Sequence, residues 1–167
     1  IKEAVSSFKG VKRRFEYVIP PAVNGSKSTP VFIDDYAHHP EELKALINGV
    51  RTLFSGRKCT LIFQPHLYSR TRDFADAFAE VLGMVDHLIL LPIYPARELP
   101  IEGVDSKMIW DKVKLDAKSL MSKEELLSWI ESKFAKNIDK EFGEVLVTAG
   151  AGDIDKLVDP IKQILVK

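Results

Sequence analysis

The sequence predicts one α/β domain in which a mostly parallel sheet of about six strands is covered by helices on both faces. Short apolar runs of strand length alternate with stretches of helical periodicity over most of the chain. That alternation is typical of a parallel sheet in a layered α/β domain. The length of 167 residues fits one domain of ordinary size, and the sequence shows neither an internal repeat nor a second domain.

The first elements are predicted to form an antiparallel hairpin. Residues 1–9 read as the tail of a helix or a linker, which Gly10 closes. Aromatic and apolar residues alternate over 15–19, which favours a strand that a pair of prolines then ends. A turn signal at 24–26 separates it from a second strand over 30–35, so the two strands are expected to pair around a loose loop.

Two helices and a buried strand are predicted next. Residues 40–54 form the clearest helix, and Pro40 suits its first position, where no backbone N–H is needed. Residues 60–63 read as a short buried strand, and a second helix is expected over 72–82. The side chains expected to face the core are Leu43, Leu46, Ile47, Val50, Leu53 and Phe54 in the first helix, and Phe74, Phe78, Val81 and Leu82 in the second.

The second half of the chain continues the alternation. The expected elements are a strand at 86–91, a long loop at 92–106, a short helix at 106–113, an edge strand at 114–117, a strand at 144–148 and a last helix from about 153. Ser122 and Glu125 form a capping box, S-x-x-E, which opens a further helix. Pro160 predicts a kink in the last helix, or a restart capped by Asp159.

Composition excludes several classes of partner. Lys plus Arg and Asp plus Glu both number 24, so a net charge of zero gives no reason to expect nucleic acid or an anionic membrane. No apolar run approaches the roughly 18 residues of a membrane span. Cys59 is the only cysteine, which favours a cytoplasmic setting and a buried, inert thiol. The start lacks an initiator Met and a signal-peptide pattern, so we expect a fragment of a longer chain.

Unusual residues gather in the loops that follow four predicted strands. These loops are 34–39, 64–72, 92–98 and 149–153. If the strands are parallel, all four loops meet at one edge of the sheet, where ligands bind in open α/β folds. The loops at the opposite edge read as plain connections. The sequence therefore predicts a ligand site at the carboxyl edge.

Each residue of these loops has a structural reading beside the functional one. Two interpretations of Asp35 are about equally favoured: that it binds a ribose diol, and that it stabilises the turn. His38 and His39 form a weak metal pair, because adjacent imidazoles diverge and no third ligand has a helpful spacing. A hydrogen bond from His38 to a ligand carboxylate or phosphate is favoured, whereas His39 is expected to cap the helix.

The basic residues and glycines give a second set of readings. Arg70 and Arg72 make a credible anion site near a helix start, although an Arg-x-Arg pair is more often a solvated surface pair. Gly150 and Gly152 fit either a phosphate-binding nest or a tight turn. The sequence has no phosphate-binding G-x-x-x-x-G-K-[ST] loop and supplies neither a nucleophile nor an obvious general base. The chain reads as part of a site.

Five ordered motifs give the chain a family resemblance. They are Asp34-Asp35-Tyr36-Ala37-His38-His39-Pro40, Phe63-Gln64-Pro65-His66, Ser69-Arg70-Thr71-Arg72-Asp73, Tyr94-Pro95-Ala96 and Gly150-Ala151-Gly152-Asp153-Ile154. Together with Arg13-Arg14-Phe15-Glu16 they resemble the C-terminal, Rossmann-like domain of the Mur ligase family of peptidoglycan synthesis. The resemblance covers essentially residues 1–167.

The resemblance implies an ATP-dependent amide-forming reaction in the bacterial cytoplasm. ATP would phosphorylate the carboxylate of UDP-N-acetylmuramate, and the amine of L-alanine would attack the acyl phosphate to release phosphate. It also implies a parent of three domains, whose central domain carries the phosphate-binding loop and the Mg²⁺ ligands. The chain alone is then expected to be inactive and to work with its own N-terminal and central domains.

Residue roles follow from the same resemblance. Arg14 matches the arginine that reaches the terminal phosphate of ATP, and Asp35 matches the carboxylate that holds the ribose. Tyr36 is expected beside the nucleotide. The groups that receive the amino-acid carboxylate and the nascent product are matched here by His38, His66 and Arg70, with Arg72 as a second candidate. No residue of this chain is expected to bind metal.

Three departures and two alternatives accompany the resemblance. Leu67 stands where some relatives have an arginine, Arg97 follows Ala96 where glycine is common, and Pro160 also departs. A related ligase that recycles murein peptides onto the same sugar nucleotide is one alternative. The Gln64-Pro65-His66 motif disfavours it. The other is a non-catalytic nucleotide-binding module, which would bind its ligand tightly without partner domains.

Overall fold

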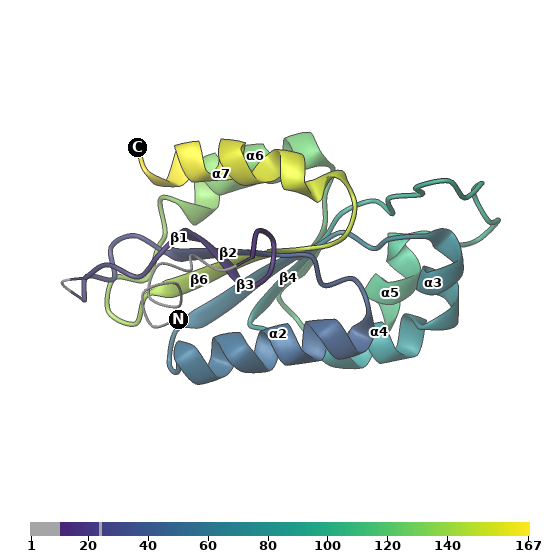
Figure 1. Cartoon of the computed structure of the whole chain (residues 1–167), viewed down its shortest axis with the longest axis horizontal. Helices are drawn as coiled ribbons and strands as arrows, with labels where there is room; N and C mark the ends of the chain where they lie inside the picture. Colours follow the sequence, from purple (N-terminus) through teal and green to yellow (C-terminus); the bar gives the residue numbers. More distant parts are fainter. Residues whose placement is uncertain (1–10, 24) are drawn as a thin grey trace, which may run out of the picture.

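The computed structural model describes residues 11–23 and 25–167 and shows a six-stranded sheet between two helical layers (Figure 1). The strands are β1 (Glu16–Ile19), β2 (Val31–Asp35), β3 (Lys58–Phe63), β4 (His87–Leu90), β5 (Lys118–Leu120) and β6 (Glu144–Ala149). The helices are α2 (Pro40–Leu53), α3 (Tyr68–Asp73), α4 (Ala75–Leu82), α5 (Ser106–Lys112), α6 (Lys123–Trp129) and α7 (Val158–Leu165). A π-helical turn covers Ile130–Phe134, and a 3-10 turn covers Asp153–Leu157.

The sheet has the predicted mixed topology. Its strand order is β1-β2-β6-β3-β4-β5, with β1 antiparallel to β2 and every other neighbouring pair parallel. The hairpin of 15–19 and 30–35 is thus confirmed, and its register shifts between Tyr17 and Ile19. The predicted linker at 1–9 lies outside the described residues.

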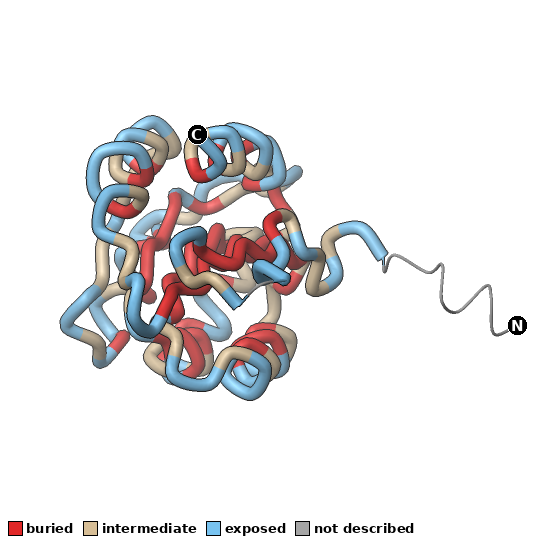
Figure 2. The backbone as a smooth tube through the Cα atoms, turned by 90° about the vertical axis from the view of Figure 1, so that its left-hand side faces the viewer, coloured by how far each residue is buried: buried red, intermediate tan, exposed pale blue. Residues whose placement is uncertain are grey.

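Side chains of the central strands fill both helical interfaces. Val31 and Ile33 of β2 pack in the cluster with α2, α4 and α5, whereas Phe32 packs in the cluster with α6 and α7. All three are fully buried, because helices cover both faces of the sheet (Figure 2). This two-sided burial explains why the central strands read as continuous apolar runs in the sequence.

The predicted helix over 72–82 is in fact two helices. The chain turns helical earlier, at Tyr68, and breaks at Phe74, whose φ of −115° and ψ of 17° are not helical. The prediction that Phe74 faces the core is wrong, since it is 40% exposed and lies against the ring of His39. Leu53, at the end of α2, is likewise 61% exposed, whereas Phe54 at the C-cap is partly buried and packs against the core.

Two further boundaries differ from the prediction. The edge strand lies at 118–120, not at 114–117, because the backbone pairs with β4 only from Lys118, opposite Leu88, onwards. The ammonium group of Lys118 donates to the carbonyls of Trp110 and Val113. The last α-helix does restart, but its N-cap is Leu157 and not Asp159. Pro160 then falls in the first turn, where its missing N–H costs nothing.

Several local predictions are confirmed. Pro40 is the first residue of α2, and Ser122 and Glu125 form the reciprocal capping box at the start of α6. Cys59 is buried, and that burial raises its pKa to about 12. Within the described residues, no helix combines the length and apolar character needed to cross a membrane.

Candidate functional site

The four polar loops meet at the carboxyl edge of the parallel strands, as predicted. Backbone hydrogen bonds tie them to one another: the N–H of Leu67 donates to the carbonyl of Tyr94, and that of Gly150 donates to the carbonyl of Asp35. His66 and Tyr94 also form an isolated parallel bridge beyond the ends of β3 and β4. The loops that follow β2, β3, β4 and β6 therefore form one connected surface.

Backbone strain concentrates at this same edge. The non-glycine residues with positive φ in the described chain are Arg13, Phe15, Leu67 and Ala96, and each lies in or beside these loops. Such conformations persist only where surrounding contacts fix them, and they cluster at functional sites. The N–H of Phe15, for example, donates to the carboxylate of Asp35 at 2.7 Å.

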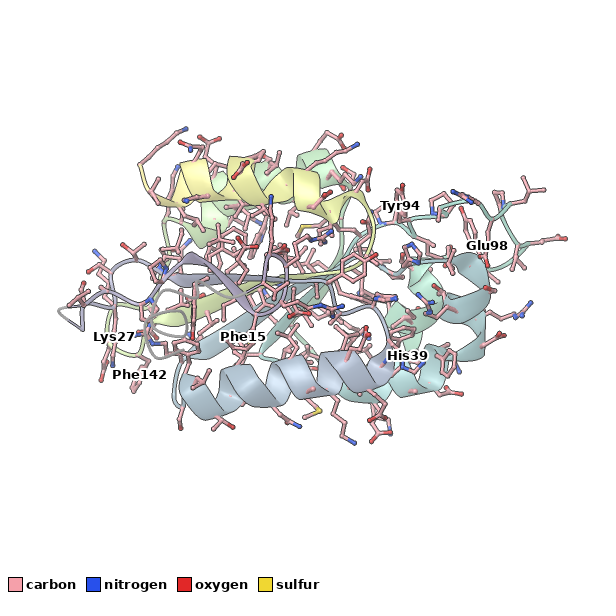
Figure 3. The ribbon with its side chains drawn as sticks, in the orientation of Figure 1. Phe15, Lys27, His39, Tyr94, Glu98 and Phe142 are labelled. Carbon is pink, nitrogen blue, oxygen red and sulfur yellow. The ribbon has the colours of Figure 1, made fainter. Side chains whose placement is uncertain are left out.

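Four rings form a continuous row across the edge, here called the ring row: Tyr36, His38, His66 and Tyr94. The distances between consecutive ring centroids are 5.3 Å, 5.7 Å and 5.7 Å. The first two contacts are edge-to-face, and His66 stacks on Tyr94, which Figure 3 places at the base of the long loop after β4. The row joins residues that lie almost sixty positions apart in the sequence.

Two adjacent arginines lie over Tyr36, and their roles differ. The guanidinium of Arg13 lies 5.1 Å from the ring centroid, while its Nε donates to Asp34 at 3.1 Å and its NH2 to the carbonyl of Gly150 at 2.5 Å. The guanidinium of Arg14 lies 5.4 Å from the centroid, and this exposed side chain makes no hydrogen bond to a residue that the structure describes. Arg13 is thus a structural clamp, and Arg14 presents a free guanidinium.

The two aspartates that end β2 have different surroundings. Burial raises the pKa of Asp34, although the Thr148 hydroxyl and Arg13 oppose that rise. Asp35 holds the turn, because its two carboxylate oxygens accept the N–H groups of Phe15 and Ala37 at 2.7 Å each. The turn-stabilising reading of Asp35 is therefore seen directly. Each oxygen retains a lone pair that suits a ribose hydroxyl.

His38 and Glu42 form a pair at the start of α2. The Nδ1 atom of His38 lies 3.0 Å from the carbonyl oxygen of Tyr36 and 3.2 Å from Oε2 of Glu42. The same carboxylate oxygen accepts the backbone N–H groups of His38 and His39. His39 occupies the N-cap position, as predicted, so Glu42 ties the cap and the His38 ring together.

The second loop brings His66 and Arg70 together and leaves Arg72 apart. NH1 of Arg70 lies 3.3 Å from Nδ1 of His66. Burial lowers the pKa of His66, and the charges of Arg70 and His38 lower it further. Arg72 is exposed, and its Nε donates to the neighbouring Asp73 at 2.8 Å. Of the two arginines, only Arg70 touches the ring row.

The Gly150 turn is filled by protein atoms. Gly150 has a φ of +151°, and a Cβ atom there would lie 2.9 Å from the carbonyl oxygen of Gln64. A Cβ on Gly152 would lie 2.6 Å from both Oε1 of Gln64 and the Tyr94 side chain. The Gln64 side chain bonds Asp153 and the N–H of Ile154. This packing supports the tight-turn reading of the glycines over a phosphate nest.

Several contributors were missed by sequence reasoning. Glu42, which pairs with His38, is not among the site residues that the sequence predicts. Glu98, which accepts from the N–H and hydroxyl of Ser69, was not singled out. The spacing of Glu42 four residues after His38 is the signal that was available, because side chains at that spacing meet on a helix.

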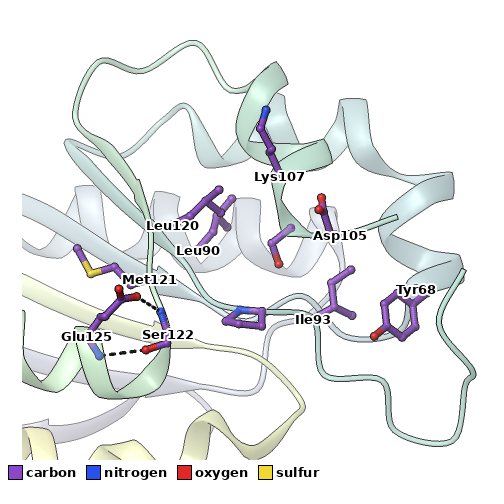
Figure 4. Close-up of a pocket in the computed structure, with 11 residues that line it drawn as sticks. Tyr68, Leu90, Ile93, Asp105, Lys107, Leu120, Met121, Ser122 and Glu125 are labelled. Atoms are coloured by element: carbon purple, nitrogen blue, oxygen red, sulfur yellow. Dashed lines mark hydrogen bonds between the residues drawn. The ribbon is translucent and has the colours of Figure 1, made fainter. Parts of the chain in front are cut away.

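Cavities also lie outside the ring row, and two of them border the ends of the sheet strands. One, of about 490 Å³, opens beyond the ends of β4 and β5 and is lined mainly by apolar side chains such as Ile93, Leu120 and Met121 (Figure 4). The other, of about 450 Å³, lies at the amino edge and is lined by His87, Trp129 and Glu144, among others. The sequence predicted only plain connections at that edge and did not indicate this cavity, whose lining includes the titratable side chains of His87 and Glu144.

Metal ligands are not gathered in the described chain. Its His, Cys, Asp and Glu side chains form no group of three or more that could hold a metal ion. The described residues at the carboxyl edge therefore do not fit a Mg²⁺ site by themselves.

Comparisons with known proteins agree on the family. A family model described as the Mur ligase, glutamate ligase domain matches residues 13–152. A UDP-N-acetylmuramate–L-alanine ligase from Cytophaga hutchinsonii is 50% identical over 97% of this chain and 32% of its own. The corresponding ligase from Parabacteroides distasonis is 49% identical over 100% of this chain and 33% of its own. The chain thus spans about a third of the length of these relatives.

Solved structures share the fold. The UDP-N-acetylmuramate–alanine ligase of Thermotoga maritima aligns with a TM-score of 0.67 at 28% identity, covering 96% of this chain and 31% of that one. A murein peptide ligase from Psychrobacter arcticus aligns with a TM-score of 0.66 at 18% identity over 98% of this chain and 32% of that one, which shows the fold alone. The chain belongs to the Mur ligase family.

Proposed function

We propose that this chain is the C-terminal domain of a three-domain ligase that joins L-alanine to UDP-N-acetylmuramate in the bacterial cytoplasm. The observation that carries the proposal is the ring row, which connects a free guanidinium, Arg14, at one end to Arg70 near the other. A nucleotide carries phosphate anions and an amino acid carries a carboxylate, and the row provides a cation for each of these groups. The high identity to alanine-adding ligases supports the choice of amino acid.

The nucleotide end of the row comprises Arg14, Asp35 and Tyr36. ATP would supply the phosphoryl group that activates the substrate carboxylate, with Mg²⁺ held by the central domain. The exposed guanidinium of Arg14 can reach the terminal phosphate, where its charge stabilises the transferring group. Asp35 can accept from the ribose hydroxyls while it holds its turn, and the Tyr36 ring lies beside the guanidinium of Arg14.

The amino-acid end comprises His38, His66 and Arg70. Arg70 keeps free N–H groups beyond its bond to His66, and a planar guanidinium matches a carboxylate in two hydrogen bonds. We assign the alanine carboxylate to Arg70 and His66. Arg72, which the structure pairs with Asp73, stays a weaker candidate for this clamp.

The proposal is tested with the full-length protein and with this chain alone. The full-length protein should release ADP only when UDP-N-acetylmuramate and L-alanine are both present, and mass spectrometry should detect the alanyl amide. This chain alone should not hydrolyse ATP. A clear preference for a tripeptide over L-alanine in competition would instead assign the chain to the peptide-recycling branch.

A further inference from the structure

His38 presents a proton-accepting nitrogen to the site. Its Nδ1 faces the carbonyl oxygen of Tyr36 at 3.0 Å and the carboxylate of Glu42 at 3.2 Å. A carbonyl oxygen only accepts hydrogen bonds, so Nδ1 carries the hydrogen. In the neutral ring the lone pair then belongs to Nε2. The side chain is 21% exposed, so a ligand can reach the ring.

His66 has the opposite arrangement. The guanidinium of Arg70 has only donors, so Nδ1 of His66 accepts at 3.3 Å and Nε2 carries the hydrogen. Burial, and then the charges of Arg70 and His38, lower the pKa of His66 and keep it neutral near pH 7. His66 is therefore a hydrogen-bond donor to a ligand oxygen. The two neighbouring imidazoles have different chemical roles.

Glu42 is held as an anion behind His38. Burial raises its pKa, but the His38 N–H, the charge of His38, the His39 N–H and the charge of Arg14 together bring the pKa below its usual value. The groups that face the His38–Glu42 pair are thus Tyr36 on its own loop, Arg14 before β1 and His66 after β3, with Arg70 behind His66.

We propose that His38 is the general base that deprotonates the incoming amino acid, and that Glu42 is the residue that positions it. A base held by a carboxylate at its far nitrogen is the arrangement that orients imidazoles in other acyl-transfer sites. The inference rests on the proposed function, because it assigns one step of that reaction. It replaces the sequence-based reading that this chain supplies no general base.

The α-ammonium group of L-alanine enters the site with three hydrogens. One proton passes to Nε2 of His38, and the N–H electron pair stays on the amine, which attacks the carbonyl carbon of the acyl phosphate. A C–N bond forms, and the bond from that carbon to the phosphate oxygen breaks. A second proton leaves with the phosphate, and the third hydrogen remains on the amide.

The test compares two nucleophiles in the full-length protein. L-alanine arrives as an ammonium ion and needs a base, whereas hydroxylamine is uncharged at neutral pH and traps an acyl phosphate as a hydroxamate without one. Replacing His38 by Gln should lower amide formation by roughly 10²-fold or more, the usual contribution of a general base. Hydroxamate formation should fall far less. An equal loss in both reactions would overturn the assignment and make His38 a structural residue.

Glu42→Gln supplies an independent readout with a matched control. Removing the carboxylate should change the pH profile of kcat/KM for alanine, because the imidazole that acts as the base loses the partner that orients it. Glu41→Gln removes the same charge from the neighbouring, exposed position and should leave the profile in place. An unmoved profile in Glu42→Gln would refute the positioning role. Absence of hydroxamate in the wild-type protein would overturn the proposed function itself.

Discussion

Replacing Arg13 by Ala should destabilise the domain through the carboxylate that it leaves behind. Arg13 and Asp34 have side chains that are 16% and 3% exposed, and their ion pair spans 3.1 Å. Removing one partner of a buried pair costs about 3–5 kcal/mol. Because Arg13 is partly exposed and Asp34 can take up a proton, we expect the lower end, about 3 kcal/mol. Loss of the bond to the Gly150 carbonyl acts in the same direction.

Chemical unfolding of this chain measures the lost free energy of unfolding. In thermal unfolding, the same loss of about 3 kcal/mol lowers Tm by roughly 6–12 °C in a domain of this size. Asp34→Asn in the Arg13→Ala background should recover part of the loss, because a carboxamide needs no cation and can still accept from the Thr148 hydroxyl. Lys12→Ala, which removes an exposed charge next door, is the matched control.

The pH dependence gives the same prediction a second check. The folded-state pKa of Asp34 is raised above its usual 3.8, so the folded state binds this proton more tightly than the unfolded chain. Its contribution to stability therefore falls as pH rises from that value through the raised pKa. Without Arg13 this fall should be steeper. A cost below about 1 kcal/mol with no recovery from Asp34→Asn would refute the clamp.

Three further outcomes are expected. Gly152→Ala should cost about 1–3 kcal/mol in chemical unfolding, because its Cβ would lie 2.6 Å from the Tyr94 side chain; a neutral result would mean that the loops repack freely. Burial lowers the pKa of His87, so the unfolded chain takes up that proton first and the free energy of unfolding falls on acidification below pH 6.5. His87→Gln should make this fall smaller in urea titrations, and an unchanged dependence of the free energy of unfolding on pH would contradict the prediction. In the full-length protein, Arg70→Ala should raise the KM for L-alanine at least tenfold, since a charged hydrogen bond is worth about 1.5–3 kcal/mol, whereas Arg72→Ala should change it little; equal effects would remove Arg70 from the clamp.

The layered sheet was predictable because its signals are local. The central strands are buried on both faces, so each reads as an apolar run, and the parallel assignment alone was enough to bring His38 and His66 to one edge. Boundaries set by single tertiary contacts were not predictable. The helix breaks at Phe74, which lies against His39, and β5 begins where Lys118 pairs with Leu88 of β4; both contacts join residues far apart in the sequence.

The division of roles at the site needed coordinates. Arg13 and Arg14 are adjacent and chemically identical, yet a turn with φ of 58° at Arg13 directs one guanidinium to Asp34 and leaves the other exposed. The two imidazoles likewise differ only through what faces Nδ1, a carbonyl and carboxylate at His38 and a guanidinium at His66.

The most direct test of the proposed site is a crystal structure of the full-length protein with a non-hydrolysable ATP analogue and L-alanine. The proposal predicts that Arg14 contacts the terminal phosphate, that Asp35 accepts from the ribose, and that the alanine carboxylate lies against Arg70. Nε2 of His38 should face the amino group of the alanine. A nucleotide or an alanine bound away from the ring row would contradict the assignment of this edge as the ligase site.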